Sequence, residues 1–314
     1  SIFYIIHNNI ILIIIYISFQ KILTKYKFRW IMISIFVNNK KREEDMLEGL
    51  TNFLRHFFGP GKEDYSFPYF SFAHFLPILV MISIIYLIYH YRKEIRANET
   101  LDLKLRAWLG FIVSTANISW YWYAIYVGTD IRVSLPLTVC ETVMMLSPYL
   151  LMTKSQHLFD VFYFWTLSGS TQALITPAVL DNYGPTQFKY YQFWTGHTGI
   201  VIVIFYCLFV LEMKINFKSM VRSIFWLLIM AIIAIYANSN IPGANYLFLA
   251  GSEAGSSILD ILPTALAPRM AILASLVILL FTIAYLPWYF INRKSQRQQD
   301  DQQLVTTIQT PTHA

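Results

Sequence analysis

Two side chains capable of chemistry lie inside long apolar stretches of this 314-residue chain, the thiol of Cys140 and the imidazole of His197. A thiol becomes a good nucleophile when a nearby base removes its proton, and a neutral imidazole can act as that base. The pair predicts nucleophilic catalysis if folding brings the two residues together. A structural interpretation stays open for both, because a lone cysteine packs as a small apolar side chain and a lone histidine hydrogen-bonds a neighbouring helix.

Polar residues on other apolar stretches fall at a similar depth. With a helical rise of about 1.5 Å per residue, Cys140 and His197 each lie roughly 8–11 Å from the same end of their helices. We expect the side chains near that level to bind substrate: His74, Asn117, Tyr121, Gln172 and Asn245. Asn117 and Gln172 also suit interhelical hydrogen bonding. The Gly- and Pro-containing loop that carries Asn245 is either a lid over the site or a plain external loop.

No metal or cofactor is expected. Cys140 and Cys207 are the two cysteines, and they form no CxxC or zinc-type cluster. The chain also contains neither a P-loop for nucleotides nor an HExxH metal motif.

The elements that must position these residues are membrane helices. Hydrophobic residues make up 56% of the chain and charged residues 13%, against about 25% in soluble domains, and the mean hydropathy is +0.48. A bilayer-crossing helix needs about 20 mostly apolar residues. Seven stretches qualify: 70–91, 107–127, 135–152, 158–179, 190–211, 220–237 and 270–291. We therefore predict an all-α, polytopic bundle of seven transmembrane helices.

The distribution of Lys and Arg predicts the orientation of this bundle. Twelve basic residues follow the odd-numbered stretches, and five lie on the opposite side. Cytoplasmic loops carry the excess of positive charge, so the N-terminus of the bundle is expected outside and its C-terminus in the cytoplasm. The chain has a net charge of +6, but its basic residues lie in short loops between apolar stretches. This distribution argues against nucleic acid as a partner.

Within the third stretch, Ser134 is expected to cap the helix, with Pro136 in the first turn. Cys140 then falls in the second turn, where the helix dipole acts weakly. Glu141 is rotated about 100° further around the helix and is expected to face elsewhere.

Four regions are predicted along the chain. Residues 1–45 are either an extra membrane segment or a leader that precedes a natural start at Met46. Residues 46–66 contain an amphipathic helix, lying in the outer membrane interface or packed against the bundle. Residues 67–291 form the transmembrane domain. Residues 292–314 are a polar, Gln-rich cytoplasmic tail expected to be disordered.

The chain resembles the YwaF-like family of bacterial integral membrane proteins and, more remotely, the animal transmembrane protein 164 acyltransferase family. The resemblance covers about residues 68–291. Its carriers are Leu135-Pro136-Leu137 before Cys140, Tyr163-Phe164-Trp165 with Gly169, Gln172-Ala173 and Thr176-Pro177, His197, Gly243-Ala244-Asn245-Tyr246 with Phe248-Leu249, and Leu286-Pro287-Trp288.

The animal branch implies transfer of a fatty acyl chain between phospholipids, with Cys140 as nucleophile and His197 as base. The implied partners are a membrane phospholipid or lysophospholipid and the bilayer itself, in a multi-pass protein of the cell membrane. The alternative is a transporter or a small-molecule-binding or lipid-binding protein without catalysis, in which the same polar pocket holds a solute. A structural membrane protein without a ligand is a third interpretation.

Overall fold

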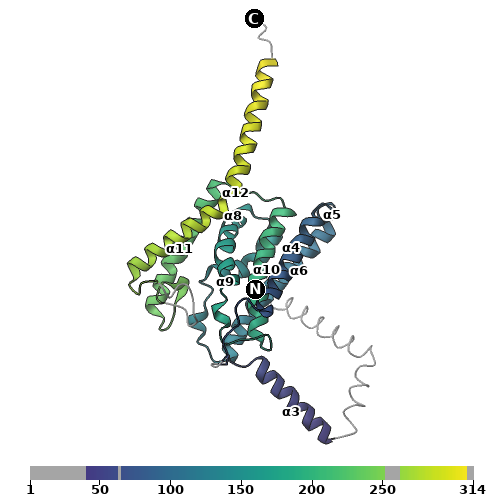
Figure 1. Cartoon of the computed structure of the whole chain (residues 1–314), viewed down its shortest axis with the longest axis vertical. Helices are drawn as coiled ribbons and strands as arrows, with labels where there is room; N and C mark the ends of the chain where they lie inside the picture. The colour runs from purple at the N-terminus through teal and green to yellow at the C-terminus, as the bar shows by residue number, and fades with distance from the viewer. Residues whose placement is uncertain (1–39, 63–64, 252–261, 310–314) are drawn as a thin grey trace, which may run out of the picture. The chain divides into compact units, whose positions relative to one another are not determined.

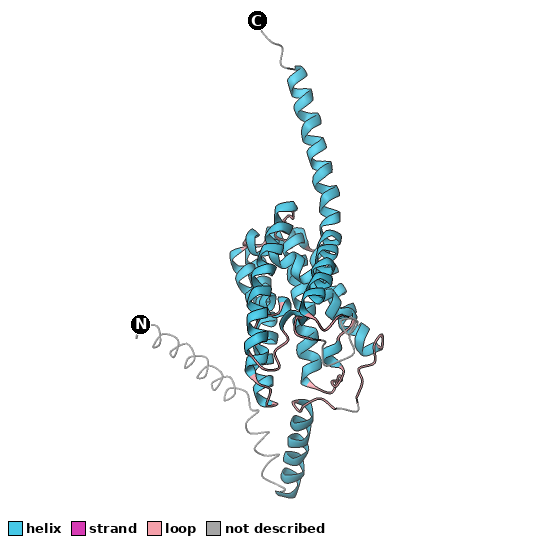
Figure 2. Cartoon of the chain, turned by 90° about the vertical axis from the view of Figure 1, so that its left-hand side faces the viewer, coloured by secondary structure: helices cyan, strands magenta, loops and turns pink. Residues whose placement is uncertain are grey.

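The computed structural model describes residues 40–62, 65–251 and 262–309, and within these residues all regular structure is helical (Figures 1 and 2). The elements in chain order are α3 (Lys40–Phe57), α4 (Phe72–His90), α5 (Arg92–Ala97), α6 (Glu99–Tyr126), η1 (Ile131–Ser134), α7 (Val139–Thr153), α8 (Gln156–Trp165), η2 (Thr166–Ser170), α9 (Thr171–Ile175), η3 (Ala178–Leu180), α10 (Phe188–Phe209), α11 (Phe217–Asn240), η4 (Tyr246–Phe248) and α12 (Leu266–Gln309). The predicted all-α class is confirmed.

Each of the seven apolar stretches contains helix, but only part of the predicted membrane topology is supported. Among the described residues, four helices are long and apolar enough to cross a bilayer, namely α4, α10, α11 and the Leu266–Gln298 part of α12. The second half of α6 is rich in Trp and Tyr, and α7 has 15 residues. The fourth stretch is divided into α8, η2 and α9. Seven crossings and their orientation therefore stay predictions.

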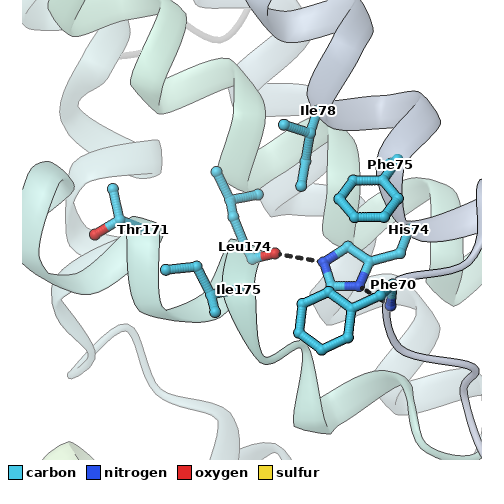
Figure 3. Close-up of a pocket in the computed structure, with 7 residues that line it drawn as sticks. All are labelled: Phe70, His74, Phe75, Ile78, Thr171, Leu174 and Ile175. Atoms are coloured by element: carbon cyan, nitrogen blue, oxygen red, sulfur yellow. Dashed lines mark hydrogen bonds between the residues drawn. The ribbon is translucent and has the colours of Figure 1, made fainter.

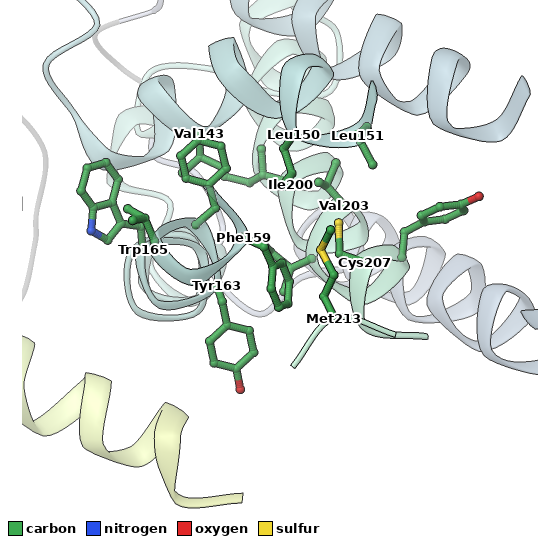
Figure 4. Packing of buried hydrophobic residues seen from close by; sticks show 14 of the residues in the cluster. Val143, Leu150, Leu151, Phe159, Tyr163, Trp165, Ile200, Val203, Cys207 and Met213 are labelled. Carbon is green, nitrogen blue, oxygen red and sulfur yellow. The ribbon is translucent and has the colours of Figure 1, made fainter. Parts of the chain in front are cut away.

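The core is centred on α10. In the most apolar window of α10, 67% of the residues are buried inside the protein, compared with 6% in α4. Side chains from α7, α8 and α10 form the largest buried cluster, in which Val143, Phe159 and Val203 pack together (Figure 4). A Cβ atom added at Gly196 would lie 2.9 Å from Sδ of Met144, so this glycine permits the close approach of α10 to α7.

The peripheral helices present large apolar side chains outward. Leu79 and Ile82 of α4, Ile232 of α11 and Ile278 of α12 are each more than half exposed. In water such surfaces would be unfavourable, whereas in a bilayer they contact lipid chains.

α12 differs from the tail expected after residue 291. It continues as one helix to Gln309, across residues predicted to be disordered (Figure 2). The segment from Asn292 to Gln309 contains neither Gly nor Pro and is rich in Gln and Arg, which have good helix propensity.

α3 belongs to a unit of its own, which ends at Phe57, while residues from Phe58 onward form a second unit. Along α3, Leu47, Leu50 and Leu54 are exposed. The helix starts at Lys40, six residues before Met46. Residues 1–39, which include most of the predicted leader, lie outside the described residues.

Candidate functional site

The helix that carries Cys140 begins later than the sequence analysis predicts. Thr138 is the N-cap of α7, and its hydroxyl accepts a hydrogen bond from the backbone N–H of Glu141 at 3.3 Å. Ser134 instead ends η1, and Leu135 is extended, as expected for the residue before a proline. Cys140 is therefore the second residue of α7, in its first turn, where unpaired backbone N–H groups and the helix dipole favour negative charge.

The thiol of Cys140 lies against η2. Its Sγ atom is 3.6 Å from Oγ of Ser170, a hydroxyl that is fully buried. The neighbouring Gly169 permits this contact, because a Cβ atom there would lie 2.9 Å from Cγ2 of Val139 and 3.4 Å from the thiol sulfur. Ser170 thus adds to the site a polar group that the sequence analysis does not select.

η2 is a π-helical segment within the predicted fourth span. π-Helical turns are rare and occur frequently at functional sites. Hydroxyl groups satisfy carbonyls along this irregular backbone, since Ser168 donates to the Phe164 carbonyl at 2.6 Å and Thr171 donates to the Leu167 carbonyl. Within the described part of the chain, the buried hydroxyl of Thr166 has no hydrogen-bond partner.

His197 lies on α10, which packs against both α7 and η2. Its Nδ1 atom is 2.9 Å from the carbonyl oxygen of Phe193, so Nδ1 carries the proton that is donated. In a neutral ring this leaves the lone pair on Nε2, which is the arrangement required of a base. Among the described residues, His197 and Cys140 share no direct hydrogen bond.

Glu141 of α7 and Lys189 of α10 interact electrostatically, and these are the two helices that carry Cys140 and His197. Lys189 of α10 is 9% exposed, and its ammonium group lies 3.4 Å from the centre of the Trp120 ring and 3.1 Å from Oε1 of Gln192. Glu141 of α7 interacts electrostatically with Lys189 and accepts a hydrogen bond from Thr138 at 3.0 Å. Glu141, which is expected to face elsewhere than Cys140, interacts in the structure with a residue of α10.

Of the predicted binding residues, Asn117 and Tyr121 lie one turn apart on α6. Asn117 is 3% exposed. The hydroxyl of Tyr121 is buried without a hydrogen-bond partner in the described structure, and Tyr121 interacts electrostatically with Glu141. Tyr121 therefore lies in the same polar region as Glu141 and Lys189.

The other three predicted binding residues have different surroundings. Both ring nitrogens of His74 are engaged, with Nε2 2.8 Å from the Leu174 carbonyl and Nδ1 3.0 Å from the backbone nitrogen of Phe70 (Figure 3). The side chain of Asn245 organises its own loop, accepting from the N–H of Gly251 and donating to the Gly251 carbonyl, both at 3.0 Å. Gln172 is exposed.

The loop that carries Asn245 packs beside the start of α7. The hydroxyl of Tyr246 accepts a hydrogen bond from the Leu135 N–H at 2.8 Å and donates to the Arg132 carbonyl at 2.5 Å. Residues 252–261, which complete the predicted lid or external loop, lie outside the described residues. In the described ranges, no group of three or more His, Cys, Asp or Glu side chains is arranged to hold a metal ion.

The all-helical fold and its long apolar helices define an integral membrane protein. A family model described as the TMEM164 family matches residues 69–289, and the chain belongs to this family. The match supports the resemblance to the animal transmembrane protein 164 family, but not the assignment to the YwaF-like bacterial group. No curated protein and no solved structure matches the chain.

Proposed function

We propose that this protein is a membrane acyltransferase in which Cys140 carries the acyl group and His197 transfers protons. The observation that carries the proposal is the position of the thiol, in the first turn of α7 and in contact with the buried hydroxyl of Ser170. A second support is the hydrogen bond from His197 Nδ1 to Phe193, which leaves Nε2 as the basic atom. Family membership makes a lipid the favoured substrate.

In the first half-reaction, Nε2 of His197 removes the thiol proton and the sulfur of Cys140 attacks the ester carbonyl carbon of a phospholipid. The carbon–sulfur bond forms, the ester carbon–oxygen bond breaks, and the imidazolium returns the proton to the leaving lysophospholipid oxygen. In the second half-reaction, the hydroxyl of an acceptor lysophospholipid loses its proton to His197 and attacks the thioester. The new ester is released and the thiol is restored.

Backbone N–H groups at the start of α7 would stabilise the developing oxyanion. The first N–H groups of a helix have no partner within the helix, and that of Cys140 is adjacent to the reacting carbon. Asn245, which is expected to bind substrate, is poorly suited to this task because its side-chain amide is bonded to Gly251. Gln172 is likewise less suited, because its side chain is exposed whereas the thiol is partly buried.

Proton transfer requires the imidazole and the thiol to come closer than they are without substrate. Catalytic hydrogen bonds are often long before substrate binds and tighten in the reactive complex. α7, η2 and α10 pack against one another, and the mechanism requires the two side chains to meet directly or through one bridging water.

Seven crossings of the cell membrane, with the N-terminus of the bundle outside, are part of this proposal. In that topology the reacting thiol lies near the outer leaflet, where it meets phospholipid entering sideways between helices. Two observations support this topology. Each of the seven apolar stretches contains helix, and Lys and Arg are in excess in the loops on one side.

The test compares purified Cys140→Ala and Cys207→Ala proteins in lipid nanodiscs, with mass spectrometry to measure acyl exchange between a labelled phospholipid and a lysophospholipid. Cys140→Ala is expected to abolish exchange and the mass of an acyl adduct on the protein. Cys207→Ala, which alters a fully buried thiol in the core cluster, serves as the matched control. Acyl exchange by Cys140→Ala protein at the wild-type rate overturns the mechanism.

His197→Gln provides the second variant, with an expected loss of roughly 10²- to 10⁴-fold in exchange rate, the usual contribution of a general base. An unchanged rate would remove His197 from the mechanism even if Cys140 proves essential.

A further inference from the structure

A small apolar cavity lies between α9 and the start of α4, with Phe70 just before that helix. Its volume is about 240 Å³, and its lining residues are Phe70, His74, Phe75, Ile78, Thr171, Leu174 and Ile175 (Figure 3). Ligand pockets for drug-sized molecules measure roughly 300–1,000 Å³, so this cavity suits a segment of a flexible chain better than a whole lipid.

The polar groups at this cavity are already engaged. The ring of His74 is 1% exposed, and its two nitrogens bond the backbones of Leu174 and Phe70. The hydroxyl of Thr171 donates to the Leu167 carbonyl. With these hydrogen bonds made, the cavity offers apolar contact and selects against a polar occupant, because a buried polar group without a partner is unfavourable.

One wall of the cavity is adjacent in sequence to the residue that contacts the thiol. Thr171, on its wall, directly follows Ser170, whose hydroxyl contacts Cys140 Sγ at 3.6 Å. Consecutive Cα atoms are about 3.8 Å apart, so the wall of the cavity and the contact surface of the thiol belong to the same turn of η2 and α9.

The other wall is accessible from lipid. α4 has 6% of its most apolar window buried, and Phe75 on this helix is 46% exposed. A hydrocarbon chain can therefore reach the cavity from the bilayer without crossing a polar layer.

We propose that this cavity holds a segment of the acyl chain of the substrate lipid and thereby sets the chain-length preference of transfer, which rests on the function proposed above. The occupant is an acyl chain because the lining is apolar, the polar atoms are engaged, α4 faces lipid, and the residue next to the wall, Ser170, contacts the reacting thiol. His74 is then a positioning residue, which fixes α4 to α9 without touching the reacting ester.

The first test fills the cavity. Ile78→Trp places an indole in it, whereas Ile82→Trp makes the same change one turn along α4, at a residue that is 52% exposed and does not line the cavity. Competition between long- and short-chain donors is measured in nanodiscs. Ile78→Trp is expected to shift the ratio of kcat/KM values about tenfold toward the short chain, the effect of about two methylenes losing apolar contact. If Ile78→Trp and Ile82→Trp proteins show the same ratio of kcat/KM values for long- and short-chain donors, the proposal is overturned.

The second test does not depend on catalysis. Cys140→Ala protein is irradiated with a phospholipid that carries a diazirine in its acyl chain, and cross-linked peptides are identified by mass spectrometry. Cross-links are expected on the lining residues. Their yield is expected to fall about tenfold when Ile78→Trp is added to Cys140→Ala protein. Adding Ile82→Trp instead is expected to leave the yield unchanged. Cross-links spread evenly along α4 overturn the cavity proposal. Cross-links confined to the lining, in a protein whose wild type shows no acyl exchange, support the acyl site and refute the proposed reaction.

Discussion

The two ends of the helix bundle differ in how completely their polar groups are hydrogen-bonded. At one end, here called the charged end, Asp102, Arg106, Lys154 and Tyr206 form a closed network. Asp102 accepts from Arg106 Nε at 3.1 Å, from Tyr206 Oη at 2.6 Å and from Lys154 Nζ at 3.3 Å. Arg106 also donates to the Leu151 carbonyl at 2.8 Å, which joins α6 to α7, while the Tyr206 hydrogen bond joins α6 to α10.

At the other end, here called the thiol end, some buried polar groups of α6, η2 and α10 are unpaired. In the described structure, the buried hydroxyls of Tyr121 and Thr166 and the indole nitrogen of Trp194 have no hydrogen-bond partner. Buried polar groups are normally satisfied, and exceptions require an explanation. We infer that the charged end is built for stability, and that the thiol end keeps hydrogen-bonding capacity for a substrate.

The largest expected effect is a loss of stability on substitution of Arg106, without a loss of activity per folded molecule. Arg106→Met leaves the buried Asp102 carboxylate without its main partner and is expected to lower the free energy of unfolding by about 3 kcal/mol, the lower end for breaking a buried ion pair. Acyl exchange per folded molecule is expected to stay at the wild-type level. Denaturant unfolding in detergent and nanodisc activity measure the two quantities.

Arg132→Met is the matched control, since Arg132 pairs with Asp130 at 2.7 Å on an exposed surface. Its unfolding midpoint is expected to match that of the wild type. Equal midpoints for the two variants would contradict the structural role of the charged end.

A smaller effect comes from removing one tyrosine hydroxyl at each end. Tyr206→Phe removes a hydrogen bond to a carboxylate and is expected to cost about 1.5–3 kcal/mol of stability. Tyr121→Phe removes a buried hydroxyl without a partner and is expected to leave stability unchanged or slightly higher, while lowering the rate of acyl exchange. If Tyr121→Phe destabilises the fold as much as Tyr206→Phe does, the distinction between the two ends fails.

The smallest expected effect is the acid sensitivity of the charged end. Asp102 precedes the stretch 107–127 that is expected to cross the bilayer. Burial by itself raises the pKa of its carboxyl group, but hydrogen bonds from Arg106 and Tyr206, with the nearby positive charges, hold that pKa below its ordinary value. A lowered folded pKa contributes stability that is present above the unfolded value of about 3.9 and is lost as pH falls through the folded value.

Thermal unfolding measured between pH 6 and pH 3 tests this expectation. The wild-type midpoint is expected to fall at the acid end of the range. Asp102→Asn protein is expected to start lower and to show a flatter profile, because it lacks the group that titrates. Parallel profiles would show that other carboxyl groups cause the acid loss.

The helical class follows from the sequence because it depends on local composition. Each stretch of about 20 apolar residues contains helix in the structure, since the backbone of such a segment satisfies its own hydrogen bonds. Local composition does not predict the residue at which α7 starts. Ser134 and Thr138 are both good N-caps, and only the extended backbone at Leu135 decides between them.

The candidate site depends on contacts between segments far apart in sequence, which apolar length cannot reveal. The approach of Ser170 to Cys140 requires the π-helical turn of η2 and the missing side chain of Gly169. The interaction of Glu141 with Lys189 depends on the rotation of α7 relative to α10. Lys189 directly precedes the apolar stretch 190–211, and a charge at the edge of a membrane segment is the signal that could have identified this interaction.

The hydroxyl groups of η2 and the start of α9 have a consequence for insertion into a bilayer. A π-helical turn loosens backbone carbonyls that an α-helix would pair, and hydrocarbon offers them no water. Here Ser168 and Thr171 donate to the carbonyls of Phe164 and Leu167. A hydropathy scan counts these hydroxyls as unfavourable, although within this segment both are hydrogen-bonded to backbone carbonyls and so need no water.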